Sequence, residues 1–197
     1  MKFNFKIQSF QTEAVENVIR VFNGQPKQER VTYRRDLGQM IDRKTGQYEI
    51  QFDDDPGYRN VAVELSDEQI LRNIRGLQAE NNIKLSPSLV RELGSVSLDV
   101  EMETGTGKTY VYIKTMFELH KRYGWSKYIV VVPSIAIREG VKKSFEVTRD
   151  HFMEWYGVKA RFFVYNSSNL HQLDEFSSGF GLNVMIINIQ AFATSLK

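Results

Sequence analysis

The sequence predicts an α/β fold, in which a parallel sheet is flanked by helices, because two kinds of segment alternate along the chain. Residues 127–132 form a continuous apolar run, K-Y-I-V-V-V, typical of a strand buried on both faces of a parallel sheet. Residues 158–164 and 183–189 also have the composition of strands. Apolar residues with helical spacing occur both before and after the predicted strand at residues 127–132. Such alternation is expected to form right-handed βαβ units.

The composition is typical of a folded globular chain and predicts no association with a membrane. The 197 residues are 42% hydrophobic and 25% charged, which suits one sizeable domain with a small accessory part. No apolar run reaches the roughly 18 residues that indicate a transmembrane helix, and the N-terminus does not resemble a signal peptide. The chain has no cysteine, so we expect no disulfide, no thiolate metal site and a cytoplasmic location. A net charge of +2 does not by itself indicate nucleic-acid binding.

A glycine-rich turn with the sequence T-G-T-G-K-T predicts a nucleotide site. The alternating residues 96–102 are expected to form a strand that leads into this turn, and a helix is expected to begin at Lys108. Glycines let backbone N–H groups converge on a phosphate, and the helix dipole adds positive charge. We expect Lys108 to reach the β- and γ-phosphates of ATP and Thr109 to bind Mg²⁺, which makes both catalytic residues. The nucleotide is expected to lie against the whole turn: Thr104, Gly105, Thr106, Gly107, Lys108 and Thr109.

The first position of this motif resembles superfamily 2 helicases and translocases, because Met102 stands where many P-loop kinases and GTPases have glycine. The resemblance implies a RecA-like P-loop NTPase domain. In that superfamily a glutamine called the Q motif reads the adenine edge, and Gln11 stands just before a predicted amphipathic helix. Gln11 and Lys108 are 108 − 11 = 97 residues apart, so we expect an inserted segment between them.

The chain is therefore expected to have three parts. Residues 1–24 contain the Q-motif helix of the RecA-like domain. Residues 25–95 are the inserted segment, with a small hairpin and helices. Residues 96–197 are the first RecA-like, ATP-binding core, truncated before its D-E box.

Within the inserted segment, residues 30–35 and 47–52 have β-propensity and are expected to pair as a hairpin. Ser66 and Gln69 have the spacing of a capping box, which predicts the start of a helix. Pro87 predicts the first position of another short helix.

Three longer stretches resemble the restriction (Res) subunit of type III restriction-modification enzymes. They are V-E-M-E-T-G-T-G-K-T-Y-V-Y at 100–112, V-V-V-P-S-I-A-I-R-E-G-V at 130–141 and I-I-N-I-Q-A-F at 186–192. The resemblance implies an N-terminal fragment of an ATP-hydrolysing motor that moves on double-stranded DNA before cleavage. It also implies a modification (methyltransferase) subunit as partner. DNA-backbone contacts are implied for three residues of the second stretch: Pro133, Ser134 and Arg138.

Some parts of such a motor are not found in the sequence. No apolar strand followed by D-E comes after the second stretch, and no second RecA-like domain or nuclease domain is present. An arginine finger alone contributes about 10³–10⁵-fold in turnover, so we expect the isolated chain to be nearly inactive as an ATPase. The alternatives are another superfamily 2 DNA helicase, a type I restriction motor subunit, a small-molecule P-loop kinase, or a non-catalytic nucleotide-binding or docking module.

Overall fold

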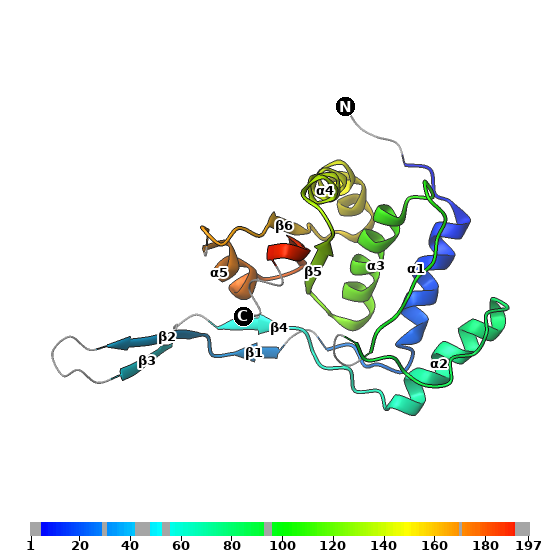
Figure 1. Ribbon diagram of the computed structural model, residues 1–197, viewed down its shortest axis with the longest axis horizontal. Helices are drawn as coiled ribbons and strands as arrows, with labels where there is room; N and C mark the ends of the chain where they lie inside the picture. Colours follow the sequence, from blue (N-terminus) through cyan, green and yellow to red (C-terminus); the bar gives the residue numbers. More distant parts are fainter. Residues whose placement is uncertain are drawn as a thin grey trace.

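A parallel sheet forms the centre of the molecule (Figure 1). The computed structural model describes residues 5–28, 31–41, 48–52, 56–92, 96–169 and 171–191. The strands of the sheet are β5 (Lys127–Val132), β6 (Arg161–Val164) and β7 (Asn183–Asn188). Their order is β5-β7-β6, and β7 pairs in parallel with both neighbours. The predicted α/β class with a parallel sheet is confirmed.

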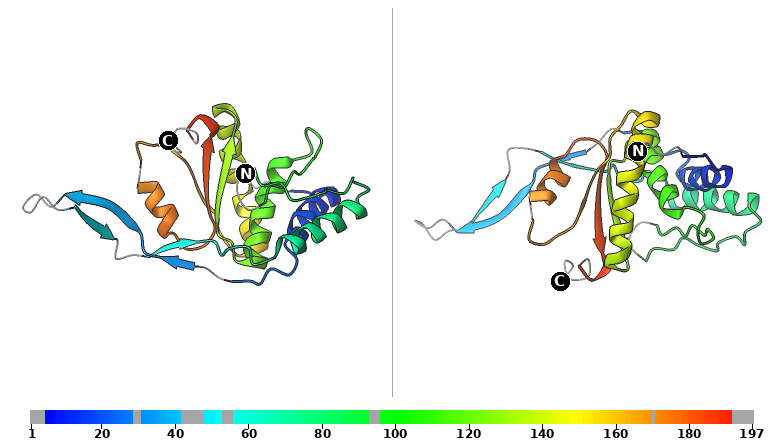
Figure 2. Two further views of the ribbon diagram at one scale, coloured as in Figure 1. Left: turned by 60° about the horizontal axis from the view of Figure 1, so that its bottom comes forward. Right: turned by 90° about the horizontal axis from the view of Figure 1, so that it is seen from above.

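Helices lie on both faces of this sheet (Figure 2). They are α3 (Lys108–Tyr123), α4 (Ile135–Tyr156) and α5 (His171–Ser178). The Phe162 ring centroid of β6 lies 5.1 Å from that of Phe145 in α4, whereas the next residue, Phe163, faces Phe176 of α5 at 6.0 Å. Successive residues of a strand point to opposite faces, so α4 and α5 cover opposite sides of the sheet.

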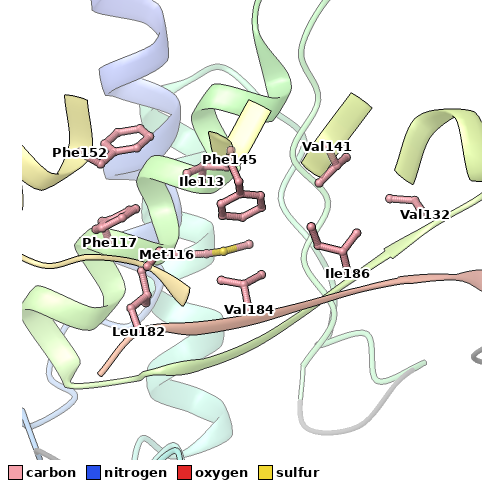
Figure 3. Packing of buried hydrophobic residues seen from close by; sticks show 11 residues of the cluster. Ile113, Met116, Phe117, Val132, Val141, Phe145, Phe152, Leu182, Val184 and Ile186 are labelled. Carbon is pink, nitrogen blue, oxygen red and sulfur yellow. The ribbon is translucent and has the colours of Figure 1, made fainter. Parts of the chain in front are cut away.

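The main hydrophobic core lies between the sheet and the helices α3 and α4 (Figure 3). Val184 and Ile186 of the middle strand are fully buried there. Aromatic rings fill the space between the two helices, with Phe152 stacked 4.9 Å from Phe117. The buried members of this core are Ile113, Met116, Phe117, Val132, Val141, Phe145, Phe152, Ala160, Leu182, Val184 and Ile186.

A second core holds α1 (Ser9–Val21) and α2 (Asp67–Glu80) against α3. The Tyr123 hydroxyl of α3 donates to the Ile19 carbonyl of α1 at 3.0 Å. The capping box of α2 is confirmed, because the Ser66 side chain accepts from the Gln69 backbone N–H and the Gln69 side chain accepts from the Ser66 N–H. The buried residues of this core are Val15, Ile19, Val21, Phe22, Ile70, Leu77, Val111, Tyr123 and Trp125.

The strands between α1 and α2 pair differently from the predicted hairpin. They are β1 (Val31–Tyr33), β2 (Asp36–Ile41), β3 (Tyr48–Phe52) and β4 (Gly57–Arg59). β3 pairs with β2 and β1 pairs with β4, so the prediction that residues 30–35 pair with 47–52 was wrong. A shorter loop loses less entropy on closure, which favours the partner nearer in sequence. The β2–β3 ribbon extends away from the rest of the molecule (Figure 1).

The predicted strand at residues 96–102 is also absent. These residues make one isolated bridge, in which the Ser97 N–H donates to the Val90 carbonyl at 2.7 Å. Their apolar side chains Val96, Leu98 and Met102 pack on the second core instead of joining the sheet. Residues 96–102 are therefore held in place by side-chain packing and not by the strand pairing that the sequence predicts.

The peptide groups at the start of β5 are bonded to the side chain of Asn60, which follows β4. The side-chain oxygen Oδ1 of Asn60 accepts from the backbone N–H groups of Ser126 (2.7 Å) and Lys127 (2.9 Å). The side-chain nitrogen Nδ2 of Asn60 donates to the Lys127 carbonyl (2.7 Å). The next residues of β5 are less covered than predicted, since Ile129 is 51% and Val131 43% exposed. The prediction that this strand is buried on both faces was therefore wrong.

The short helix predicted from Pro87 does not form over residues 87–92, and its predicted end at Gly94 lies outside the described residues. The carbonyls of Ser86 and Pro87 accept hydrogen bonds from the Arg75 guanidinium of α2, both at 2.9 Å. These bonds hold the chain at Ser86 and Pro87 against α2. Within the described parts of the chain, no helix has the length and apolar character required to cross a membrane.

We expect Phe152→Ala to destabilise the chain strongly, because Phe152 is 1% exposed and its ring packs against Phe117 and Tyr110. The expected loss in the free energy of unfolding is about 3–5 kcal/mol, measured by urea denaturation. Met153→Ala is the matched control, since the Met153 side chain is 45% exposed and its removal should cost below about 1 kcal/mol. Similar losses in the two variants would contradict this description of the core.

Candidate functional site

The glycine-rich turn adopts a backbone suited to binding an anion. Gly105 has φ +82° and Gly107 has φ +85°, values that other residues rarely adopt. Gly107 is also the N-cap of α3. The first turn of α3 carries no acidic residue, and its N-cap makes no side-chain hydrogen bond. Backbone N–H donors at this helix end are therefore available to a phosphate.

The polar side chains of the turn fold back onto the turn itself. The Lys108 ammonium donates to the Glu103 carbonyl at 2.8 Å, and the Thr106 hydroxyl donates to the same oxygen at 2.6 Å. Thr104 and Lys108 are exposed, whereas Thr109 is half-buried. Lys108 must leave the carbonyl to reach a phosphate, and a charged oxygen is a stronger acceptor than a neutral one.

Gln11 contacts this turn although it lies far away in sequence. Its side-chain amide donates to the Thr106 carbonyl at 2.8 Å. A Cβ added to Gly107 would lie 2.6 Å from the same amide nitrogen, so the glycine permits the close approach. The sequence predicted that Gln11 precedes the first helix. In the structure Gln11 belongs to the first turn of α1.

The packing of α1 on α3 brings Gln11 to the turn. Arg122 of α3 makes two hydrogen bonds with the Glu16 carboxylate of α1, at 2.9 and 2.7 Å. Exposed ion pairs contribute little to stability. The buried contact between Tyr123 of α3 and Ile19 of α1 therefore contributes more to holding the two helices together. The sequence predicted Gln11 and the turn as separate motifs, and the structure brings them together.

The residues with an implied DNA contact lie at the carboxyl end of β5. Ser134 is the N-cap of α4, and its hydroxyl accepts from the Ile137 N–H at 3.3 Å. Pro133 precedes it in the bend between β5 and α4. The Arg138 guanidinium pairs with the adjacent Glu139 carboxylate at 3.0 Å, and its side chain is 21% exposed. The glycine-rich turn lies at the same end of the sheet (Figure 2). Arg138 is partly neutralised, whereas the helix N-terminus at Ser134 faces no such carboxylate within its own first turn.

Two tyrosines beside the turn were not predicted as site residues. The Tyr110 hydroxyl is 3.0 Å from Nε2 of His151 in α4, which fixes the start of α3 against α4. Tyr112 lies one helical turn after Thr109, and its hydroxyl oxygen is enclosed by protein. Burial raises the pKa of the Tyr112 phenol, and the neighbouring Thr109 hydroxyl lowers it in part. The available signal was the T-Y-V-Y sequence, which puts aromatic residues directly after the phosphate motif.

A groove of about 630 Å³ lies beside α1 and is distinct from the turn. Its carboxylates disfavour phosphate, so we do not regard it as the nucleotide site. No cluster of three or more potential metal ligands occurs in the described ranges. The groove is lined by Ser9, Thr12, Glu13, Glu16, Asn17, Arg20, Glu80 and Asn81.

We expect Gln11→Glu to destabilise the chain, because a carboxylate oxygen would replace the amide donor that faces the Thr106 carbonyl. The expected loss is about 1–2 kcal/mol in urea denaturation. Gln8→Glu is the matched control, since Gln8 is the N-cap of α1 and makes no side-chain capping bond. An acid at that helix end should change stability by less than about 1 kcal/mol, in the stabilising direction. Equal effects at the two positions would refute the Gln11 contact.

Comparison with known proteins identifies the family of this chain. Residues 61–196, more than half of the chain, match the family described as type III restriction enzyme, res subunit. The chain is 38% identical over 110 residues to the EcoP15I Res subunit of Escherichia coli, covering 55% of this chain and 11% of that protein. It is 43% identical over 94 residues to the StyLTI Res subunit of Salmonella typhimurium, covering 44% of this chain and 9% of the relative.

A third relative, the EcoPI Res subunit of Escherichia phage P1, is 34% identical over 110 residues, or 55% of this chain and 11% of the relative. The matched part thus spans about a tenth of the length of these curated relatives. The family model includes the glycine-rich turn and all strands of the parallel sheet, and it corresponds to a RecA-like P-loop domain. The chain belongs to the family of type III restriction enzyme Res subunits.

Proposed function

We propose that this chain contributes to the ATP-driven motor of a type III restriction endonuclease, as the first part of its helicase-like ATP-binding domain. The observation that carries the proposal is the contact between Gln11 and the Thr106 carbonyl, which joins a Q-motif glutamine to a P-loop. In this proposal residues 25–95 are an insertion between these two motifs. Membership of the Res family favours a restriction motor over a small-molecule kinase or an unrelated helicase.

The residues of the site have separable roles in this proposal. Backbone N–H groups of Gly105 and Gly107 surround the phosphates, and Lys108 exchanges the Glu103 carbonyl for a phosphate oxygen. The Thr109 hydroxyl offers a lone pair to Mg²⁺, which supplies charge neutralisation at the β- and γ-phosphates. A glutamine amide has two N–H donors, so Gln11 can keep one on Thr106 and present the other with its oxygen to adenine.

Hydrolysis, movement on double-stranded DNA and cooperation with a modification subunit belong to the proposal for the longer protein. Among the described residues after the turn, the middle strand β7 ends at Asn188, without adjacent carboxylates. Asp174 and Glu175 lie on α5 and are exposed. Carboxylates at a strand end would fix Mg²⁺ and the attacking water, so this chain alone should bind nucleotide and hydrolyse almost none.

We expect Mg²⁺·ATP to raise the melting temperature of the native chain and not that of Lys108→Ala. Ligand at 100 times its Kd adds about 2.7 kcal/mol to stability, which is about 5–11 °C for a chain of this size. Differential scanning fluorimetry measures the shift. Lys142→Ala is the matched control, because Lys142 is exposed on α4 and should respond like the native chain. A shift that persists in Lys108→Ala, or that is absent from the native chain, would overturn the nucleotide site.

We expect Ser134→Asp to weaken DNA binding without unfolding the chain. Aspartate is as good an N-cap as serine, but its charge repels a DNA phosphate at this helix end. Fluorescence anisotropy with a labelled duplex measures the affinity. Two or three phosphate contacts predict a slope of about −2 to −3 in log K against log salt for the native chain.

Ser134→Asn is the matched control for the DNA experiment, because asparagine is an equally good N-cap and is uncharged. It should bind duplex like the native chain, whereas Ser134→Asp should bind more weakly at low salt. Equal affinities of the two variants would show that α4 does not face the DNA backbone.

A further inference from the structure

Lys114 of α3 is a buried cation without a carboxylate partner. The residue is 6% exposed, and among the described residues its ammonium makes one hydrogen bond, to the Thr12 hydroxyl of α1 at 3.3 Å. The Trp155 ring of α4 has its centroid 5.7 Å from the same nitrogen. Arg35, the other buried cation of the described ranges, pairs instead with the Asp174 carboxylate at 3.8 Å. The charge of Lys114 is therefore met only by a neutral hydroxyl and an aromatic ring.

The carboxylates that act on Lys114 through space are bonded to other groups. Glu16 accepts two hydrogen bonds from Arg122, at 2.9 and 2.7 Å. Glu118 lies 3.6 Å from the same guanidinium and accepts from the Tyr156 hydroxyl at 2.7 Å. Burial lowers the pKa of Lys114, and the charges of Glu118 and Glu16 raise it in part. A buried charge without a close opposite charge destabilises the fold, so a residue that served packing alone would be apolar here.

The ammonium of Lys114 is bonded to the first turn of α1, a helix whose N-cap residue makes no side-chain capping bond. That residue is Gln8, and glutamine is not among the residues that cap helices well. The Thr12 hydroxyl donates to the Gln8 carbonyl at 3.3 Å and accepts from Lys114, so its position is fixed from both sides. Gln11, the neighbour of Thr12, donates to the Thr106 carbonyl. The first turn of α1 is thus attached to α3 and its preceding turn through two adjacent residues.

We propose that Lys114 is a positioning residue for Gln11, which it holds in place for adenine through its bond to Thr12. The inference rests on the nucleotide site proposed above, in which Gln11 reads the base. A glutamine amide can pair with adenine only when its oxygen and nitrogen are held in a defined place. Helix ends fray, and the first turn of α1 has no side-chain cap, so the bond from Lys114 keeps this turn and Gln11 in one geometry. The dipole of α1 disfavours a cation at its first turn, which is a further reason why stability alone does not explain Lys114.

The test is Lys114→Met, which fills the same space with an apolar chain and removes the donor. Isothermal titration calorimetry measures binding of Mg²⁺·ATP and of Mg²⁺·tripolyphosphate, which has no base. The Kd for ATP should rise about 3–10-fold, because the bonds of Gln11 to adenine are weakened, while the Kd for tripolyphosphate stays within about twofold of the native value. The melting temperature without ligand should rise or stay within about 4 °C of the native value, because an apolar group replaces a buried charge.

Two further variants separate positioning from packing. Lys121→Met is the matched control, because Lys121 is an exposed lysine of the same helix, and both of its Kd values should be native. Thr12→Val removes the hydroxyl on the other side of the bond and should raise the Kd for ATP by a similar factor. In a double-mutant cycle, the two substitutions Lys114→Met and Thr12→Val together should raise this Kd no more than Lys114→Met alone, because both break the same bond.

A native ratio of the two Kd values in Lys114→Met, or additive effects in the cycle, would overturn the inference alone and leave the nucleotide site in place. A melting temperature of Lys114→Met more than about 4 °C below the native value would assign Lys114 to packing and overturn the inference as well. A native chain that binds neither ATP nor tripolyphosphate overturns the proposed function, and this inference with it. A native chain that binds both ligands equally overturns adenine reading by Gln11, on which the inference depends.

Discussion

Helix α3 is buried on two sides, and this constraint determines where the glycine-rich turn lies. Ile113, Met116 and Phe117 belong to the core beneath the sheet, while Val111 and Tyr123 belong to the core of α1 and α2. Interiors are close-packed, so a helix that fills two cores cannot slide or rotate without disturbing both. Its N-terminus is consequently held at the carboxyl end of the sheet, where ligands bind in open α/β folds.

The chain between α1 and α3 is held to the rest of the molecule by packing as well as by single contacts, since Ile70 and Leu77 of α2 are buried in the second core. Asn60 bonds to the start of β5, the Tyr33 hydroxyl lies 2.6 Å from that of Ser177 on α5, and Arg35 pairs with Asp174 at 3.8 Å. The entropy of closing a loop grows slowly with its length, so the long segment between α1 and α3 adds little to the cost of bringing these two helices together. The Gln11–Thr106 contact thus forms across 95 residues.

The sequence was informative where structure depends on nearby residues. The glycine turn, the capping box of α2 and the bounds of β5 follow from local patterns of Gly, Ser and Val. The strand at 96–102 and the helix from Pro87 were mispredicted, and both segments make contacts that local patterns do not reveal. Residues of the first segment pack on the second core, and the carbonyls of Ser86 and Pro87 accept hydrogen bonds from Arg75. Within the site, the Gln11 contact required three-dimensional packing to be seen.

The glycine-rich turn is closed on itself, and this affects how tightly a nucleotide can bind. Lys108 and Thr106 both donate to the Glu103 carbonyl, and Gln11 holds the Thr106 carbonyl. The two neutral bonds, from Thr106 and Gln11, each contribute about 0.5–1.5 kcal/mol, and a bond from a charged group such as the Lys108 ammonium contributes about 1.5–3 kcal/mol. A phosphate must replace some of these bonds before it gains its own contacts. The exchange favours the ligand because a phosphate is charged, but the intrinsic affinity is reduced by the bonds that are broken. In the proposed site Gln11 would contact adenine while it holds the Thr106 carbonyl, so adenine binding and the opening of the turn would act on the same side chain.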